Sequence, residues 1–529
     1  MKFIEETKKR RTFAVIAHPD AGKTTLTEKL LLYGGAIQLA GHVRAKKDRK
    51  KTQSDWMKLE QERGISITTS AMQFTYKNYV LNLLDTPGHQ DFSEDTYRTL
   101  MAVDSAIMLI DASKGVEPQT IQLFHICRQR KIPIITFINK MDLPAKDPFE
   151  LLDEVENVLG ISTVPMVWPI GSGRDFKGIY HIPTSKVYLY EKTHNQMYKA
   201  PVQTTGMDDP LLLDLIDKEI YKNFKESLEL VIHVLPEFDL ERFHQGEITP
   251  VFFGSALNNF GIELFLDEFI KIAPSPQLLK LADGNTIEIQ EDKFVAYVFK
   301  LQANMNRFHK DRVAFVRVAS GKFIRGMEVN IAYKKKFVKL SSPVAFFGQE
   351  RNVIDEAYPG DIVGFINPGL FQIGDVLYTG QEIEIHPLPQ FAPEIFARIT
   401  LTDTSKIKSY KKGIMELTEE GIVQIFFIEE GSTIFGAIGQ LQFEVFQFRL
   451  LEEYNSPTKL EILPFECSRW ILEQDKNKFS SYDYIVKDKN NNYVVLFKSK
   501  FRLANFQKEN PSIKLFESPL ELEKYKAKI

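Results

Sequence analysis

Cysteine is nearly absent from this chain of 529 residues. The two that occur, Cys127 and Cys467, lie far apart and in no metal-ligand spacing, which argues against a cysteine-built metal site and fits a reducing compartment. Charge of one sign is also lacking: the net charge is −3, so any contact with nucleic acid must come from local patches. No apolar run approaches the roughly 18–20 residues of a membrane span. We therefore expect a cytoplasmic protein that contacts no membrane.

A phosphate-binding loop is the strongest motif in the sequence. Residues 12–16 are apolar and β-favouring, which is typical of a buried strand, and residues 25–32 are typical of a helix. The segment 17–24 between them, AHPDAGKT, matches G-x-x-x-x-G-K-[ST] except that Ala17 takes the first position. Backbone N–H groups and the helix N-terminus of such a loop converge on an anion.

Individual residues of this loop have the chemistry that a nucleotide phosphate requires. Gly22 lets the backbone come close to a phosphate. Lys23 supplies a positive charge for the β- and γ-phosphates, and Thr24 offers a hydroxyl to Mg²⁺.

Three further motifs each follow an apolar strand pattern: residues 85–88 (DTPG), 139–142 (NKMD) and 254–256 (GSA). Asp85 can hold Mg²⁺ through water, and the Gly88 N–H can bond a γ-phosphate. Asp142 can accept two hydrogen bonds from the N1–H and N2–H₂ edge of guanine, a donor pair that adenine lacks.

The remaining positions complete a guanine site. Asn139 is expected to tie the base to the phosphate loop, and Lys140 is expected to cover the ring. The backbone N–H groups of residues 254–256 can reach guanine O6.

The order and placement of these motifs resemble the G domain of translational GTPases. The resemblance implies GTP as the nucleotide and Mg²⁺ as cofactor. It also implies that Ser66 closes on Mg²⁺ and the γ-phosphate, with Thr68 as the alternative. The predicted metal ligands are therefore Thr24, Ser66 and Asp85, the last through water. The predicted GTP contacts are Ala17, His18, Pro19, Asp20, Ala21, Gly22, Lys23, Thr24, Thr25, Asp85, Thr86, Pro87, Gly88, His89, Asn139, Lys140, Met141, Asp142, Ser255 and Ala256.

His89 is the predicted catalytic residue. Phosphoryl transfer to water needs a water held in line with the γ-phosphate, and an imidazole directly after the Gly88 contact can position it. The resemblance implies that this histidine turns inward on the ribosome, that Pro19 and Ile65 form an apolar gate around it, and that Asp20 contributes to a monovalent cation site. Arg63 is either an arginine finger or, more simply, a partner in a salt bridge of its own loop.

The pattern along the chain predicts three domains. Residues 1–275 alternate strands and helices, which indicates an α/β P-loop domain, with an insertion at about 171–247 that resembles one in elongation factor G. Within this insertion, residues 211–235 are typical of a helix. Residues 276–387 show short β-branched and aromatic runs between glycine turns, which predicts an antiparallel β-barrel. Residues 388–529 mix both signals and predict an α+β domain, in which residues 406–420 have the pattern of an amphipathic helix. The basic stretch 44–51 is either a solvated loop or a switch arm that touches RNA phosphates.

Two sequence segments resemble the release factor 3 family of translational GTPases, the class-II release factors. One is residues 54–66, around the switch, and the other is residues 440–450 (QLQFEVFQFRL). The resemblance covers essentially the whole chain. It implies a ribosome-stimulated GTPase of translation termination that promotes the departure of class-I release factors after peptide release, and whose own departure follows GTP hydrolysis. Its implied partners are ribosomal RNA and proteins and class-I release factors, not DNA, and we expect a monomer.

Two other functions remain open from the sequence. The first is an elongation-type or ribosome-protection GTPase. The residues after the predicted barrel are enough for about one domain, whereas a translocase needs additional domains there, and this argues against the first function. The second is a GTP-gated binding protein whose hydrolysis is incidental, and the presence of His89 argues against it.

Overall fold

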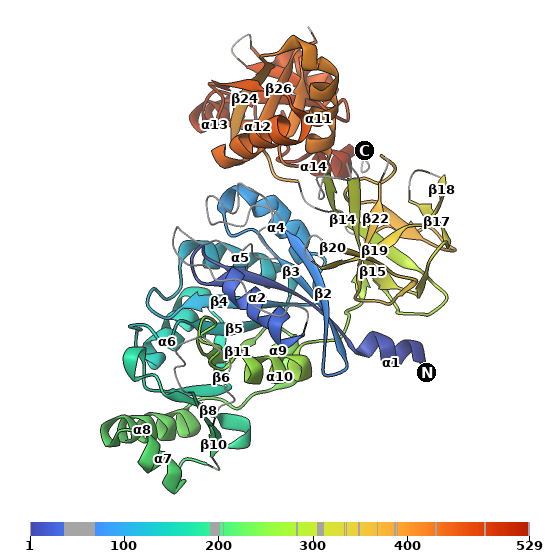
Figure 1. Cartoon of the computed structure of the whole chain (residues 1–529). Coiled ribbons are helices and arrows are strands. Elements are labelled where there is room, and N and C mark those ends of the chain that lie inside the picture. Colours follow the sequence, from blue (N-terminus) through green and yellow to red (C-terminus); the bar gives the residue numbers. More distant parts are fainter. Residues whose placement is uncertain are drawn as a thin grey trace.

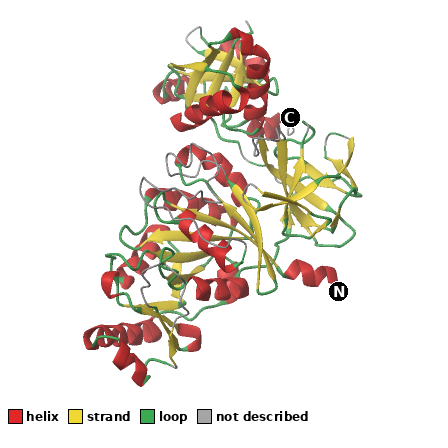
Figure 2. Cartoon of the chain, viewed as in Figure 1, coloured by secondary structure: helices red, strands yellow, loops and turns green. Residues whose placement is uncertain are grey.

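The computed structural model of the chain describes residues 2–35, 69–190, 202–204, 206–281, 284–303, 312–332, 334, 336–347, 350–367, 369–385, 388, 390–428, 431–480 and 483–526. These residues form three units that follow one another along the sequence (Figure 1). Helices flank the sheet of the first unit, strands dominate the second, and the third contains both (Figure 2). This is the fold class that the sequence predicts.

The first unit is built on a mostly parallel sheet. Its helices are α1 Lys2–Lys8, α2 Lys23–Tyr33, α4 Ser93–Leu100, α5 Pro118–Arg130, α6 Pro148–Leu159 and α10 Ile262–Ile272. Its strands are β1 Arg10–Ala17, β2 Ser70–Tyr76, β3 Tyr79–Asp85, β4 Ser105–Asp111, β5 Ile134–Asn139, β6 Ser162–Pro165 and β11 Ile248–Phe253.

The order of the strands explains where the motifs meet. Strands β3, β1, β4, β5 and β11 are neighbours and run parallel, while β2 pairs antiparallel with β3. The carboxyl ends of parallel strands lie at one edge of a sheet, where ligands of open α/β sheets bind. The four motifs follow β1, β3, β5 and β11, so the chain brings all of them to that edge.

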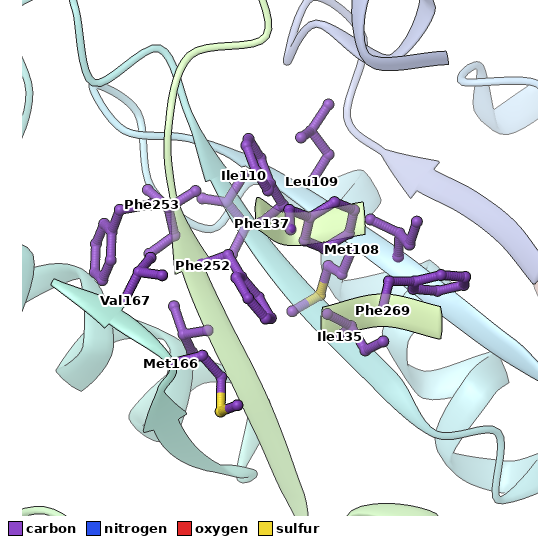
Figure 3. Close-up of a cluster of buried hydrophobic side chains, with 14 of the residues drawn as sticks. Met108, Leu109, Ile110, Ile135, Phe137, Met166, Val167, Phe252, Phe253 and Phe269 are labelled. Carbon is purple, nitrogen blue, oxygen red and sulfur yellow. The ribbon is translucent and has the colours of Figure 1, made fainter. Parts of the chain in front are cut away.

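The core of this unit lies on both faces of the central strands. Figure 3 shows Met108 of β4, Phe137 of β5 and Phe252 of β11 packed together with Phe269 of α10. All four side chains are buried. Burial on both faces explains why these strands are nearly continuous apolar runs in the sequence, without alternation.

An insertion leaves the sheet between β6 and β11. Its strands β7 Val167–Ile170, β8 Gly178–His181, β9 Lys186–Leu189 and β10 Val202–Thr204 form a separate antiparallel sheet. Its helices are α7 Pro210–Leu215, α8 Lys218–Val234 and α9 Leu240–His244. The helical stretch expected over residues 211–235 is divided, because Asp217 accepts the Glu219 N–H at 2.8 Å and starts α8 as a new helix.

The second unit contains a set of antiparallel strands. They are β12 Leu279–Lys280, β13 Thr286–Ile287, β14 Val295–Ala303, β15 Arg312–Ser320, β16 Phe323–Ile324, β17 Glu328–Ile331, β18 Lys336–Lys339, β19 Pro343–Phe347, β20 Glu350–Val353, β21 Glu356–Ala357, β22 Ile362–Ile366 and β23 Val376–Tyr378. A strand pairing and a buried ion pair are among the contacts that join this unit to the first. Strand β19 pairs with β2, and Arg317 forms a buried ion pair with Asp104 at 2.6 Å.

The third unit combines one antiparallel sheet with four helices in the described part of the chain. The strands are β24 Ile395–Leu401, β25 Gln424–Phe427, β26 Thr433–Ala437, β27 Thr458–Leu463, β28 Cys467–Trp470, β29 Tyr484–Asp488 and β30 Tyr493–Phe497. The helices are α11 Ile407–Glu419, α12 Gln440–Tyr454, α13 Lys500–Glu509 and α14 Pro519–Lys526.

A buried arginine joins the third unit to the second. Arg449 of α12 donates to Glu420 at 2.5 Å and to the Ala303 carbonyl of β14 at 3.2 Å. Glu420 in turn accepts the Ala303 N–H at 2.6 Å.

Among the helices of the described residues, none combines the length and the apolar character needed to cross a membrane.

Candidate functional site

The phosphate loop turns sharply between β1 and α2. Asp20 and Gly22 both have positive φ values, 68° and 100°. Gly22 is the N-cap residue of α2, and a Cβ added there would overlap the Asn139 side chain. Only glycine meets both demands at this position. The loop therefore directs the N-terminus of α2 toward the edge of the sheet where the other motifs lie, which is the arrangement that binds phosphate.

Lys23 and Asp85 meet beside this loop. The Lys23 Nζ lies 2.5 Å from the Asp85 Oδ1, and both side chains are buried. Asp85 is the last residue of β3, next to β1. The following residue, Thr86, donates its hydroxyl to the Val15 carbonyl at 2.7 Å and so attaches the 85–88 segment to β1.

Asn139 joins two of the motifs. Its Nδ2 donates to the Ala21 carbonyl at 2.9 Å, and its Oδ1 accepts the Ala256 N–H at 2.8 Å. The phosphate loop and the 254–256 segment are thus held by one buried amide. The sequence suggested a link from Asn139 to the phosphate loop, and the structure adds the second bond, to Ala256.

Lys140 lies along the same loop. Its φ is 68°, and its Nζ donates to the Asp20 carbonyl at 2.6 Å and to Asp111 at 2.7 Å. Burial alone would raise the pKa of Asp111, but hydrogen bonds from Lys140 and Ser113 outweigh it and lower that pKa. Asp111 therefore remains an anion that fixes the Lys140 ammonium.

The proposed guanine end of the site has a defined carboxylate. Asp142 accepts a hydrogen bond from Asn258 Nδ2 at 2.7 Å. The Ser255 N–H donates to the Phe260 carbonyl at 3.0 Å. The N–H groups of Ser255 and Ala256 therefore both have acceptors within the protein, so a guanine O6 at this place would share them. Met141 is fully buried.

His89 lies just beyond β3, before the short 3₁₀ turn η1 Gln90–Phe92 and helix α4. Its side chain is 36% exposed. The ring Nδ1 accepts the Asp91 N–H at 3.2 Å and lies 3.3 Å from the Asp91 Oδ1. Pro19 of the phosphate loop is the nearest neighbour of a Cβ built on Gly88, at 3.9 Å. The loop and the His89 segment are therefore adjacent.

Some of the other predicted contact residues lie around this edge of the sheet, and others lie outside the described residues. The His18 Nε2 is 3.3 Å from Glu117, and the Pro87 carbonyl accepts from Thr96 at 3.4 Å. Thr24 and Thr25 lie in the first turn of α2. Ser66 and Thr68, with Arg63, Ile65 and the basic stretch 44–51, lie outside the described residues.

Oxygen donors dominate the predicted metal site. In the described part of the chain, no group of three or more histidine, cysteine, aspartate or glutamate side chains is arranged to bind a metal ion. Thr24 and Asp85 provide a hydroxyl and a carboxylate, which suit Mg²⁺, a cation that usually keeps several waters and shares phosphate oxygens. The residues present therefore fit Mg²⁺ bound together with a nucleotide.

Three residues of the site were missed by sequence reasoning: Asp91, Asp111 and Asn258. Asp111 is the last residue of β4, which lies between β1 and β5, and both of those strands end at motifs. This position in the sheet could have identified Asp111 as a site residue. Asn258 lies only three residues after Ser255, but nothing in the sequence pairs it with Asp142. The partner of Asp91 lies far along the chain and has no local signal.

Comparisons with known families cover almost the whole chain. The family described as "Elongation factor Tu GTP binding domain" matches residues 8–275, "Elongation factor G domain 2" matches residues 293–380, and "Class II release factor RF3, C-terminal domain" matches residues 385–507. The fold and the phosphate-loop site thus define a translational GTPase.

Individual relatives specify the family. The peptide chain release factor 3 of Symbiobacterium thermophilum is 48% identical over 96% of this chain and 97% of its own length. That of Trichormus variabilis is 50% identical over 96% of this chain and 95% of its own. The chain belongs to the peptide chain release factor 3 family.

A solved structure supports the fold alone. A crystal structure of a Thermus thermophilus protein superposes with a TM-score of 0.70 at 20% identity, over 91% of this chain and 71% of that one. The arrangement of the units is therefore shared with a protein of very different sequence.

Proposed function

We propose that this chain binds GTP with Mg²⁺ at the edge described above, hydrolyses it when stimulated by the ribosome, and promotes the departure of class-I release factors after peptide release. Hydrolysis then lets the chain itself depart. The observation that carries the proposal is the Asn139 amide, which holds the phosphate loop and the 254–256 segment in one arrangement, together with membership of the release factor 3 family.

Each part of the nucleotide has a proposed partner. The phosphate loop from Ala17 to Thr25 surrounds the phosphates, and Lys23 moves its charge from Asp85 to the β- and γ-phosphates. Asp142, oriented by Asn258, accepts the guanine N1–H and N2–H₂ donors. The Ser255 and Ala256 N–H groups face O6.

The oxygen donors of the site suggest which residues would bind Mg²⁺. Thr24 would ligate Mg²⁺ directly, Asp85 would hold it through water, and Ser66 would join when its segment closes. The ion, when bound, neutralises charge on the β- and γ-phosphates. Asp20 would contribute to a monovalent cation site.

His89 is the proposed catalytic residue. Its imidazole would orient the attacking water in line with the γ-phosphate, after turning from the position where it faces Asp91. Apolar neighbours would keep it turned away in the free protein, with Pro19 as one of them. The G domain alone is therefore expected to hydrolyse GTP slowly.

Membership of the release factor 3 family supports a proposal about the cellular setting. We propose a monomer that acts in the cytoplasm on ribosomes, through contacts with ribosomal RNA and proteins. Class-I release factors are the partners whose departure it promotes.

One experiment tests this proposal. GTP hydrolysis is measured with the chain alone and with ribosomes that carry a class-I release factor, and the departure of that factor is scored in the same reaction. Wild type should show strong stimulation and GTP-dependent departure. The His89→Ala variant should lose about 10²-fold or more of the stimulated rate while it still binds GTP, and His125→Ala, an exposed histidine of α5, should match wild type.

Other outcomes redirect the proposal. Stimulation without departure would indicate an elongation-type or ribosome-protection GTPase. A His89→Ala variant that supports repeated rounds of departure would indicate a GTP-gated binding protein. Tight GTP binding with no stimulation by ribosomes would contradict the ribosomal role.

A further inference from the structure

Asp91 connects the predicted catalytic histidine to the third unit. One carboxylate oxygen, Oδ1, lies 3.3 Å from the His89 Nδ1. The other, Oδ2, accepts the Leu441 N–H at 2.8 Å, in the first turn of α12. The two bonded residues lie 350 positions apart in the chain. Because Asp91 is only 7% exposed, one nearly buried carboxylate faces both the histidine and the helix N-terminus.

The third unit is shaped to receive this carboxylate. Gly439, the N-cap residue of α12, is so close to Asp91 that an added Cβ would overlap the carboxylate group. The Gly439 backbone is extended, with a φ of −136°, so conformational freedom does not require glycine there. Space for Asp91 is the reason for the missing side chain.

Apolar side chains surround the contact. Phe92, which follows Asp91, packs with Leu441 and Val445 of α12 in a small buried cluster. The cluster keeps water from the carboxylate, so its hydrogen bond to the helix is less easily replaced by a bond to water. The helix N-terminus also favours a negative charge at this place.

We propose that Asp91 is a positioning residue for His89, and that it transmits to the imidazole whether the third unit is docked on the first. The proposal rests on the catalytic role proposed for His89. With α12 docked, the carboxylate is held by Leu441, the η1 turn is fixed, and the Asp91 N–H binds the His89 Nδ1. With α12 displaced, the carboxylate loses its anchor and the imidazole loses its fixed orientation. Movement of the third unit thereby acts on the hydrolytic site.

A spectroscopic test reads the imidazole directly. The full chain is labelled with ¹⁵N-histidine, and the His89 ring signals are assigned by their loss in His89→Ala. Wild type should show one tautomer, with Nδ1 unprotonated because it accepts the Asp91 N–H. Asp91→Ala and Gly439→Ala should both shift these signals toward an average of two tautomers. Gln440→Ala, an exposed change in the same helix turn, should leave them unchanged.

Kinetics supply a second readout. On ribosomes, Asp91→Ala and Gly439→Ala should each lower kcat for GTP hydrolysis by about tenfold with KM for GTP unchanged, because neither residue belongs to the proposed nucleotide contacts. The double variant should lose no more than either single variant, because both changes break the same contact.

Clear results would overturn the proposal. They are a Gly439→Ala variant whose His89 signals match wild type, or kcat losses that multiply in the double variant. If Gly439→Ala fails to fold, Asp91→Ala still tests the same contact from the first unit. Retained hydrolysis in His89→Ala would refute the catalytic role of His89, whereas the ring signals test the contact independently.

Discussion

Replacing Asn139 by alanine should weaken guanine-nucleotide binding by at least about 30-fold. The amide is 2% exposed and makes two hydrogen bonds, of 2.9 Å to the Ala21 carbonyl and 2.8 Å from the Ala256 N–H. Its removal leaves both backbone groups without this partner, at about 1–3 kcal/mol each.

The free-energy cost of removing the amide should appear as weaker nucleotide binding, because the nucleotide-free variant can relax. Without the amide, the phosphate loop and the 254–256 segment separate slightly, and water binds the two backbone groups. Nucleotide binding must then bring the segments together and remove that water. A loss of about 2 kcal/mol or more corresponds to at least about 30-fold in Kd, since each 1.4 kcal/mol is tenfold.

Isothermal titration calorimetry with GDP and Mg²⁺ measures this change. Asn490→Ala, which removes an exposed amide of the third unit, is the matched control and should bind like wild type. Asn139→Asp should bind at least as poorly as Asn139→Ala, because a carboxylate oxygen would then face the Ala21 carbonyl. A folded Asn139→Ala variant with a Kd within about threefold of wild type would refute the reasoning.

Two further predictions concern protonation. Burial raises the pKa of the Cys127 thiol to about 12 and also raises the pKa of the Cys467 thiol. Neither thiol should therefore react with a thiol reagent at pH 8 until the chain is unfolded. Fast labelling of the folded chain would contradict this prediction. The lowered pKa of Asp111 means that its pairing with Lys140 stabilises the fold above the unfolded pKa of about 4 and is lost as the pH falls through the lower folded value. The melting-temperature gap between wild type and Asp111→Asn should therefore stay nearly constant from pH 7 to about pH 5 and shrink as the pH falls below about 4. A gap that does not shrink below about pH 4 would exclude that pairing as its source.

Much of the fold was predictable because its signals are local. Strand β1 at Arg10–Ala17 surrounds the apolar stretch expected at residues 12–16, and helix α11 at Ile407–Glu419 matches the amphipathic pattern beginning at Lys406. The exception over residues 211–235 is also local in origin, because one capping aspartate, Asp217, divides the helix. Periodicity shows an amphipathic face but not where a cap interrupts it.

The sequence by itself determined which residues gather at the edge of the first sheet. Each motif follows a strand directly, and parallel strands bring such positions together whatever the rest of the chain does. The tertiary structure alone decided which of these residues touch. Asn258 meets Asp142, Lys140 meets Asp111, and Asp91 meets the first turn of α12. These contacts depend on side-chain distances between segments far apart in the sequence, and no local pattern of residues encodes those distances.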